Sequence, residues 1–421
     1  MRVLLLAEHC NPAWPSLPVV GYRACKAIGD HVEAVVATHV RNVPEIDRAG
    51  LGRCEVVALD NEYIARPMYA LSKALRGGTS VAWTTNIAMA YPSYLAFERE
   101  VWRRFGADLR AGRFDLVHRV TPMSPTLPSP MAKWSPVPFV LGPLNGGLRW
   151  PPGFGGELAR EREWMTYVRG AHRLLPYHRA TLRRSAAILA SFAHTIADLP
   201  PAVRDRVIDF PEVGIEPSLF SAPPERRHEG PLTLLYAGRL VPYKCPDVLL
   251  LALAANPELR RHRTVIVGEG PERARLDRIV AEHGLGDCVE FTGNLPQARV
   301  GDLMRAADVF VFPSIRELGA GVVVEAMACG LACVVVDYGA PGRLVGPGRG
   351  VRVPLGTKDE LVAAFAAELG ALVGDPGRVA ALGAAARDHA LAHYDWDVKA
   401  RKTVEVYRWV LGQRAEKPTF D

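Results

Sequence analysis

The sequence has no long hydrophobic run and few cysteines, and each shortage excludes a class of protein. No apolar stretch in the 421 residues reaches the roughly 18–20 residues of a membrane-spanning helix, and the longest candidate, residues 86–97, contains Pro92. The N-terminus, Met-Arg-Val-Leu-Leu-Leu-Ala-Glu, turns acidic too early for a signal peptide. The seven cysteines include no C-x-x-C pair, which disfavours structural zinc and a disulfide framework. We therefore expect a soluble, cytoplasmic protein with reduced thiols.

Several catalytic motifs are also missing. The sequence contains no H-E-x-x-H and no serine or cysteine nucleophile elbow. Gly268-Glu-Gly270 is an incomplete dinucleotide fingerprint, because the third glycine position holds Arg273. Asp395-Trp-Asp397 has the D-x-D form of a metal site, but it stands at an expected helix start, where carboxylates cap backbone amides.

The composition is that of a globular chain with an uneven charge. Hydrophobic residues make up 49% and charged residues 23%, and the length suggests two or three domains. Residues 1–212 hold 26 Lys/Arg against 19 Asp/Glu, a net +7, whereas the rest holds 25 against 26, a net −1. The basic first half predicts either a solvated face or an anionic partner such as a membrane surface, a phosphate or a nucleic acid.

Short aliphatic runs alternate with helical stretches throughout the chain. Many are continuously apolar, as in parallel strands that helices cover on both faces, and the alternation predicts a doubly wound α/β fold. The predicted strands are residues 2–7, 32–38, 55–59, 115–118, 138–141, 187–190, 232–236, 264–267, 288–292, 309–312, 333–336 and 351–353.

The strand–helix pattern runs twice, with an irregular, proline-rich hinge near Asp209–Pro224. We predict an N-terminal domain of residues 1–212 and a C-terminal domain of residues 213–395. The last expected helix, within residues 396–421, returns to the first domain. Two such domains facing one another would bind a ligand in the cleft between the carboxyl ends of their strands.

Residues 312–330 are the richest candidate site. They read as a strand end, a glycine-rich turn and a helix, with Glu317 in the turn and Glu325 about one turn into the helix. Gly319 and Gly321 permit close approach of a ligand, and the free amides of a helix start bind anions. A carboxylate beside an anion site is costly unless it binds something such as sugar hydroxyls.

A second constellation is Tyr236-Ala-Gly-Arg-Leu-Val-Pro-Tyr-Lys244. A predicted strand ends at Gly238, and Arg239 and Lys244 lie on the loop that follows. Two cations near the carboxyl end of a strand suit a pyrophosphate.

The combination resembles glycosyltransferase family 4, whose members are retaining, nucleotide-sugar-dependent enzymes of the GT-B fold. The resemblance is carried by Gly238-Arg-Leu…Lys244, Val267-Gly-Glu-Gly-Pro271, Val289-Glu-Phe-Thr-Gly293, Ala307-Asp-Val-Phe-Val-Phe-Pro-Ser314 and the E-x7-E pair with Glu-Ala-Met-Ala-Cys-Gly330. It is strong over residues 230–345 and weaker at Asp115–His118 and Pro138–Gly147.

The resemblance implies transfer of a hexose-type sugar from a nucleotide-diphosphate sugar to an acceptor hydroxyl, with retention and without a metal or other cofactor. The first domain would bind the acceptor and the second the donor. Arg239 and Lys244 would contact the diphosphate, Glu325 the ribose and Glu317 the sugar hydroxyls. The remaining implied donor contacts are Gly238 at the strand end, the turn of Gly319, Ala320, Gly321 and Val322, and Gly293 and Asn294 at the nucleobase.

The first domain departs from the family pattern. Its first loop, Glu8–Ser16, lacks the usual double glycine, and the D-x-x-H-x-H element keeps His118 but has Val120 at its second histidine position. His9, His118, Gly146 and Gly147 are the candidate first-domain contacts. Two alternatives to a transferase stay open. One is a nucleotide-sugar epimerase or hydrolase on the same fold, and the other, which the departures motivate, is a non-catalytic nucleotide-sugar-binding subunit.

The basic stretch of residues 148–184 interleaves arginines with aromatics. It predicts an interfacial segment at an anionic membrane bearing a lipid-linked acceptor, an acceptor-pocket wall, or a solvated helix pair. Membrane contact would place the protein peripherally at the inner face of the cell membrane. Nucleic acid is disfavoured, since no recognition module accompanies the charge. The acceptor class stays open among glycans, lipid-linked carriers and small natural products, and 43 arginines against 8 lysines fit a GC-rich bacterial genome.

Overall fold

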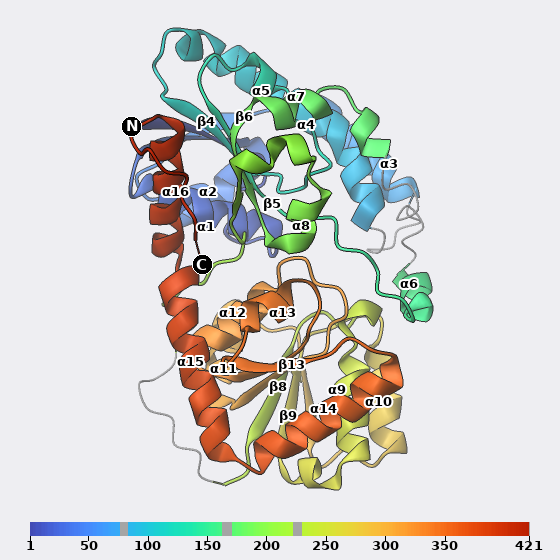
Figure 1. Ribbon diagram of the computed structural model, residues 1–421. Coiled ribbons are helices and arrows are strands. Elements are labelled where there is room, and N and C mark those ends of the chain that lie inside the picture. The colour runs from blue at the N-terminus through green and yellow to red at the C-terminus, as the bar shows by residue number, and fades with distance from the viewer. Residues whose placement is uncertain (76–82, 162–170, 222–229, 421) are drawn as a thin grey trace. The chain divides into compact units, whose positions relative to one another are not determined.

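The chain forms two α/β units, each built on one parallel sheet (Figure 1). The computed structural model describes residues 1–75, 83–161, 171–221 and 230–420. The first unit comprises residues 1–147, 162–212 and 396–421, and the second comprises residues 148–161 and 213–395.

The two sheets have seven and six strands. The first has the order β3-β2-β1-β4-β5-β6-β7, from β1 (Arg2–Ala7), β2 (Glu33–His39), β3 (Glu55–Leu59), β4 (Leu116–Thr121), β5 (Phe139–Leu144), β6 (Ser185–Ala190) and β7 (Val207–Asp209). The second has the order β10-β9-β8-β11-β12-β13, from β8 (Thr233–Ala237), β9 (Arg263–Val267), β10 (Val289–Gly293), β11 (Val309–Phe312), β12 (Ala332–Val336) and β13 (Gly350–Val353).

Helices follow most strands. Those of the first unit are α1 (Leu17–Gly29), α2 (Val43–Ala49), α3 (Glu62–Leu75), α4 (Trp83–Arg110), α5 (Met131–Trp134), α7 (His178–Arg184), α8 (Phe192–Asp198) and α16 (Trp396–Val410). Those of the second are α6 (Gly155–Glu161), α9 (Pro246–Ala255), α10 (Arg273–Glu282), α11 (Gln297–Ala306), α12 (Gly321–Ala328), α13 (Gly339–Val345), α14 (Lys358–Val373) and α15 (Pro376–Tyr394).

Helices bury both faces of the first sheet. One core contains side chains of α4, including the fully buried Tyr94 and Phe97. The core on the opposite face contains Tyr22 of α1 and Tyr407 of α16, and these two helices pack side by side (Figure 1). Because both faces are covered, the strands read as continuous apolar runs.

The predicted doubly wound fold is confirmed. Each of the twelve predicted strands overlaps an observed one, and the three-residue strand β7 is the one described strand that was not predicted. The chain passes into the second unit between residues 212 and 213, and it returns to the first unit between residues 395 and 396.

The placement of residues 148–161 in the first domain was wrong. Glu157 Oε1 lies 2.9 Å from Lys358 Nζ, and the Tyr338 hydroxyl donates to the Arg149 carbonyl at 2.8 Å. These contacts with residues far along the chain hold the segment to the second unit, and its Phe154 is fully buried.

Close backbone packing explains the glycines of the Val267–Pro271 motif. A Cβ on Gly268 would lie 2.0 Å from the Gly238 carbonyl oxygen, and one on Gly270 would lie 2.2 Å from the Leu240 carbonyl oxygen. Gly268 also has φ of +130°, which side chains rarely permit. The two glycines therefore let the loop after β9 pack directly on the loop after β8.

We predict that Gly268→Ala lowers the free energy of unfolding of the second unit by more than about 2 kcal/mol, because it adds both a steric clash and backbone strain. Thermal unfolding measures the loss. The control is Gly286→Ala, where no described atom lies within 4 Å of an added Cβ. Equal melting temperatures for the two variants would contradict the packing argument.

Candidate functional site

The order of strands in the second sheet places two loops next to each other. Strands β8 and β11 are neighbours, with β9 and β10 beyond β8 and with β12 and β13 beyond β11. Sheets of this kind bind ligands outside the carboxyl ends of the strands where the strand order reverses. The loops that follow β8 and β11, residues 238–245 and 313–320, contain most of the predicted donor-binding residues.

Lys244 and Glu317 form an ion pair between these loops. The Lys244 ammonium, at the end of the 3-10 helix η5 (Pro242–Lys244), donates to Glu317 Oε1. Lys244 Nζ lies 4.8 Å from the centre of the Phe312 ring, and the Ser314 hydroxyl lies 3.2 Å from Glu317 Oε1. The two charged side chains are only 11% and 12% exposed. A cation and a carboxylate are thus fixed together at the strand ends, since separating them without new partners would leave buried charges.

Arg239 lies at the exposed side of the same loop. The Gly238 amide donates to the Val267 carbonyl at 3.0 Å, which anchors the end of β8. The next residue, Arg239, is exposed and donates from Nη2 to the Tyr243 hydroxyl at 2.8 Å. The loop therefore carries one nearly buried cation, Lys244, and one solvent-facing cation, Arg239.

The turn before α12 has strained backbone. Ala320 occupies the N-cap position with φ of 52°, a left-handed conformation that costs a non-glycine residue roughly 1–3 kcal/mol. No described side chain caps the helix start, whose first residues are Gly321 and Val322. Together with Gly319, this turn presents backbone amides at the positive end of a helix, the arrangement that binds anions.

The remaining predicted donor residues lie further apart. Glu325 is half-buried on α12, one turn from the helix start. Gly293 ends β10, two strands and so about 10 Å from β8, and the exposed Asn294 follows it. The structure therefore joins the two central loops directly and places the Gly293–Asn294 turn at the same edge of the sheet.

His118, a candidate first-domain contact, has a packing role in the structure. His118 lies inside β4 and is 1% exposed. Its Nδ1 accepts from the Tyr407 hydroxyl at 2.6 Å and its Nε2 donates to the Gly142 carbonyl at 2.6 Å. One ring nitrogen therefore ties the sheet to α16 and the other ties β4 to β5, and burial lowers the pKa of His118 to about 4.

The other first-unit candidates lie on loops after strands. His9 follows β1, and its backbone is tied to the Thr121 hydroxyl through two bonds of 3.0 Å. Burial lowers the pKa of His9 to about 4. Gly146 and Gly147 follow β5, and an added Cβ would meet Pro125 at 2.8 Å or Asp198 at 2.6 Å. Those two glycines have a packing reason, and their contact with a donor stays a prediction.

Sequence reasoning missed two groups of polar residues. Ser314 and Tyr243 are partners of Glu317 and Arg239, and their positions just after strands were the available signal. A second group gathers at the ends of β1, β2 and β3 in the first unit, around Glu8, His39 and Glu62.

The described parts of the basic segment, residues 148–184, fall in different units. Arg162, Trp164, Tyr167 and Arg169 lie outside the described residues. In the described part, residues 148–161 belong to the second unit and residues 171–184 to the first. No helix in the described part of the chain has the length and apolarity to cross a membrane.

Asp397 of the D-x-D motif lies in the first turn of α16, as predicted. It pairs with His31 Nε2 at 2.7 Å and with Arg401 at 3.3 Å. Across the described ranges, no group of three or more His, Cys, Asp or Glu side chains is arranged to hold a metal ion.

We predict that stability falls with acid partly through His118. The unfolded histidine takes up a proton near pH 6.5, but the folded one only near pH 4, so protons favour the unfolded chain across that interval. The shift corresponds to about 3 kcal/mol lost by pH 4. The glutamine of a His118→Gln variant does not titrate, so the melting temperature of this variant should fall less between pH 7 and pH 4 than that of wild type. The control is His283→Gln, which changes an exposed histidine. Parallel curves for wild type and His118→Gln would overturn this assignment.

Two Rossmann-like units with parallel sheets define a GT-B fold, and solved structures agree. Sucrose-phosphate synthase from Thermosynechococcus elongatus superposes with a TM-score of 0.66 at 18% identity, covering 98% of this chain and 100% of that one. Anabaena Alr3699/HepE in complex with UDP gives 0.62 at 17% identity, covering 96% and 99%.

Sequence comparisons identify the family. The family described as "Glycosyl transferases group 1" matches residues 220–388. A D-inositol 3-phosphate glycosyltransferase of Stackebrandtia nassauensis is 32% identical over 308 residues, covering 64% of this chain and 68% of the relative. A protein of the same name from Streptomyces bingchenggensis is 36% identical over 184 residues, covering 41% of this chain and only 39% of the relative. The chain belongs to the glycosyl transferases group 1 family, which confirms the predicted glycosyltransferase resemblance at this level.

Proposed function

We propose that the protein is a retaining glycosyltransferase that moves a hexose-type sugar from a nucleotide-diphosphate sugar to an acceptor hydroxyl. The observation that carries the proposal is the Lys244–Glu317 pair beside the uncapped start of α12, at the strand-order reversal and within the family-matched residues. This edge offers positive charge for a diphosphate and carboxylates for hydroxyl groups.

Each residue has a proposed role. Lys244 and Arg239 neutralise the diphosphate, and the amides of residues 319–322 bind its oxygens or the sugar. Glu317 accepts hydrogen bonds from sugar hydroxyls, and Glu325 binds the ribose. The Gly293–Asn294 turn holds the nucleobase. The Lys244–Glu317 pair keeps both groups oriented until the donor supplies each with a new partner.

The proposed chemistry needs no nucleophile from the protein. A bond forms between the acceptor oxygen and the anomeric carbon, on the face from which the nucleotide diphosphate departs. The bond from that carbon to the phosphate oxygen breaks, and the departing oxygen takes the acceptor proton. Lys244 and Arg239 stabilise the charge that develops on the leaving group, so we expect turnover without a divalent metal.

Relatives narrow the substrates worth testing. UDP is the nucleotide bound in the Anabaena structure, and the sequence relatives are D-inositol 3-phosphate glycosyltransferases by name. We propose UDP-sugars as the first donors to test. A polyhydroxylated acceptor, free, in a glycan or lipid-linked, is the acceptor class we propose.

We predict that Lys244→Met or Glu325→Ala lowers kcat/KM by at least about 10²–10³-fold, because each removes a contact with the donor. The measurement is UDP release from a panel of UDP-sugars with pooled carbohydrate acceptors, together with the anomeric configuration of the product by NMR. The exposed glutamate variant Glu282→Ala is the control for Glu325→Ala. Wild-type turnover in both site variants would refute the site.

The double variant Lys244→Met/Glu317→Gln guards against misfolding, since the single lysine change leaves the nearly buried Glu317 carboxylate without its cation. It should fold yet show neither turnover nor stabilisation by UDP. Donor conversion that proceeds unchanged without an acceptor would favour the epimerase or hydrolase alternative. UDP binding without turnover across the panel would favour a binding subunit.

We also propose that residues 171–184 contact an anionic membrane. Leu174 is 87% exposed. The arginines close to it in sequence, Arg173, Arg179, Arg183 and Arg184, are exposed as well. An exposed apolar side chain among cations suits an acidic lipid surface.

We predict that the protein sediments with vesicles containing phosphatidylglycerol. The double variant Leu174→Ser/Arg183→Ser should sediment with these vesicles to a smaller extent. Equal sedimentation with neutral phosphatidylcholine vesicles would contradict the proposal.

A further inference from the structure

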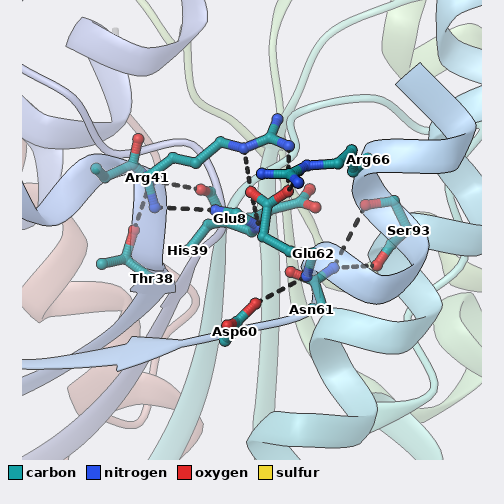
Figure 2. A network of polar contacts seen from close by, with 10 residues as sticks. Glu8, Thr38, His39, Arg41, Asp60, Asn61, Glu62, Arg66 and Ser93 are labelled. Atoms are coloured by element: carbon teal, nitrogen blue, oxygen red, sulfur yellow. Dashed lines mark hydrogen bonds and ion pairs between the residues drawn. The ribbon is translucent and has the colours of Figure 1, made fainter. Parts of the chain in front are cut away.

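A network of polar side chains lies at the carboxyl ends of three neighbouring strands of the first unit (Figure 2). We call it the strand-end cluster. It consists of Glu8 after β1, His39 at the end of β2, Arg41 beyond it, and Asn61 and Glu62 after β3. Figure 2 shows Glu8 beside His39, with the Arg41 and Arg66 side chains reaching toward Glu62.

Hydrogen bonds from neighbouring residues hold the cluster in place. Asn42 Nδ2 donates to the Glu8 carbonyl at 2.7 Å and to Thr38 Oγ1 at 2.9 Å, which ties the loop after β1 to the end of β2. Asn61 Nδ2 donates to the Ser93 carbonyl at 2.8 Å. These bonds fix the relative positions of the loops that carry the cluster.

His39 carries a donor that has no acceptor. Its Nδ1 accepts from the Arg41 backbone amide at 3.1 Å, so the proton of the neutral ring lies on Nε2. Nε2 has no hydrogen-bond partner among the described residues, and the nearest carboxylate oxygen, Glu62 Oε1, is 3.8 Å away. His39 is 6% exposed, and burial lowers its pKa and favours the neutral ring.

Two buried amides also have an unused atom. Asn61 is fully buried, and within the described chain its Oδ1 accepts no hydrogen bond, while its nitrogen is directed to Ser93 (Figure 2). Asn11, on the loop after β1, is also fully buried, with its Nδ2 unpaired in the described part of the chain. Buried polar atoms are nearly always paired, so unpaired donors and an acceptor at one sheet edge indicate a missing partner.

The missing partner is a group that both donates and accepts. A hydroxyl can accept from the His39 Nε2 proton and donate to Asn61 Oδ1 or to the Glu62 carboxylate. Burial raises the pKa of Glu8 to about 8, so the neutral Glu8 carboxyl can itself donate a hydrogen bond to such a group. Glu62 is held for this role by Arg41, whose Nη2 donates to Glu62 Oε2 at 2.5 Å.

An anion fits the cluster less well. Three carboxyl groups, those of Glu8, Asp60 and Glu62, gather there, and the Asp60 side chain accepts from the Glu62 amide at 2.9 Å. The Asp60 and Glu62 carboxylates would repel a phosphate, and the nearest cation, Arg41, is already bonded to Glu62.

We propose that the strand-end cluster binds the hydroxyl groups of a neutral polyol, a sugar or cyclitol ring, and is the acceptor subsite of the first unit. The assignment of the bound ring as an acceptor rests on the proposed function. The binding of the ring does not.

His39→Asn is the sharpest test. His39 caps η1 (Val40–Asn42) by accepting from the Arg41 amide, and asparagine can make that same bond while lacking the Nε2 donor. Asn61→Ala is the second variant, and His31→Asn, an exposed histidine of the same unit, is the matched control. Ligand-observed NMR titrations use myo-inositol, methyl α-D-glucopyranoside and glucose 6-phosphate, and UDP thermal shifts are recorded in parallel.

We expect wild type and His31→Asn to bind at least one neutral probe saturably, and His39→Asn and Asn61→Ala to bind it at least tenfold more weakly. UDP should stabilise all four proteins equally. The proposal is overturned if wild type binds only glucose 6-phosphate, if no neutral probe binds because water alone occupies the cluster, or if the variants bind like wild type. If UDP fails to bind the wild-type protein, that result counts against the proposed function and leaves the polyol-binding proposal intact.

Discussion

Parallel strands bring all their carboxyl ends to one edge of a sheet, and the polar chemistry of both units depends on this constraint. Helices cover the faces of the sheets, so the edge is where polar side chains can gather. In the second sheet the constraint joins Lys244 to Glu317, 73 positions apart, because β8 and β11 are neighbours. In the first sheet it joins the loops after β1, β2 and β3 into the strand-end cluster.

Close backbone packing makes the second-unit edge possible. Gly268 lets its loop touch the Gly238 carbonyl, a contact that a Cβ would prevent. Cys245, directly after Lys244, and Ala320, directly before α12, both have left-handed backbone without being glycine. Strain of this kind persists only where the surrounding fold imposes it, and it concentrates at functional sites. Here it flanks the cation and the helix start proposed to hold the donor.

The two edges differ in their electrostatics, and the difference matches the proposed division of labour. The second unit combines Lys244 and Arg239 with the amides of a helix start, which suits a diphosphate. The strand-end cluster combines carboxyl groups with the neutral His39 ring and the Asn61 amide, which suits hydroxyl groups. On this proposal the acceptor subsite is not cationic, and the exposed arginines near Leu174 account for part of the net +7 of residues 1–212.

The sequence alone determined the doubly wound fold, the return of the C-terminal helix and the donor motifs, since strand runs and glycine turns are local patterns read from neighbouring residues. It could not assign His118, whose partners Gly142 and Tyr407 lie 24 and 289 positions away. Nor could it place residues 148–161, which Lys358 holds from 201 positions along the chain. The strand-end cluster went unpredicted because Glu8, His39 and Asn61 are each unremarkable in sequence. Only the tertiary structure shows that three strand ends meet there and that, within the described residues, buried donors and an acceptor are left unpaired.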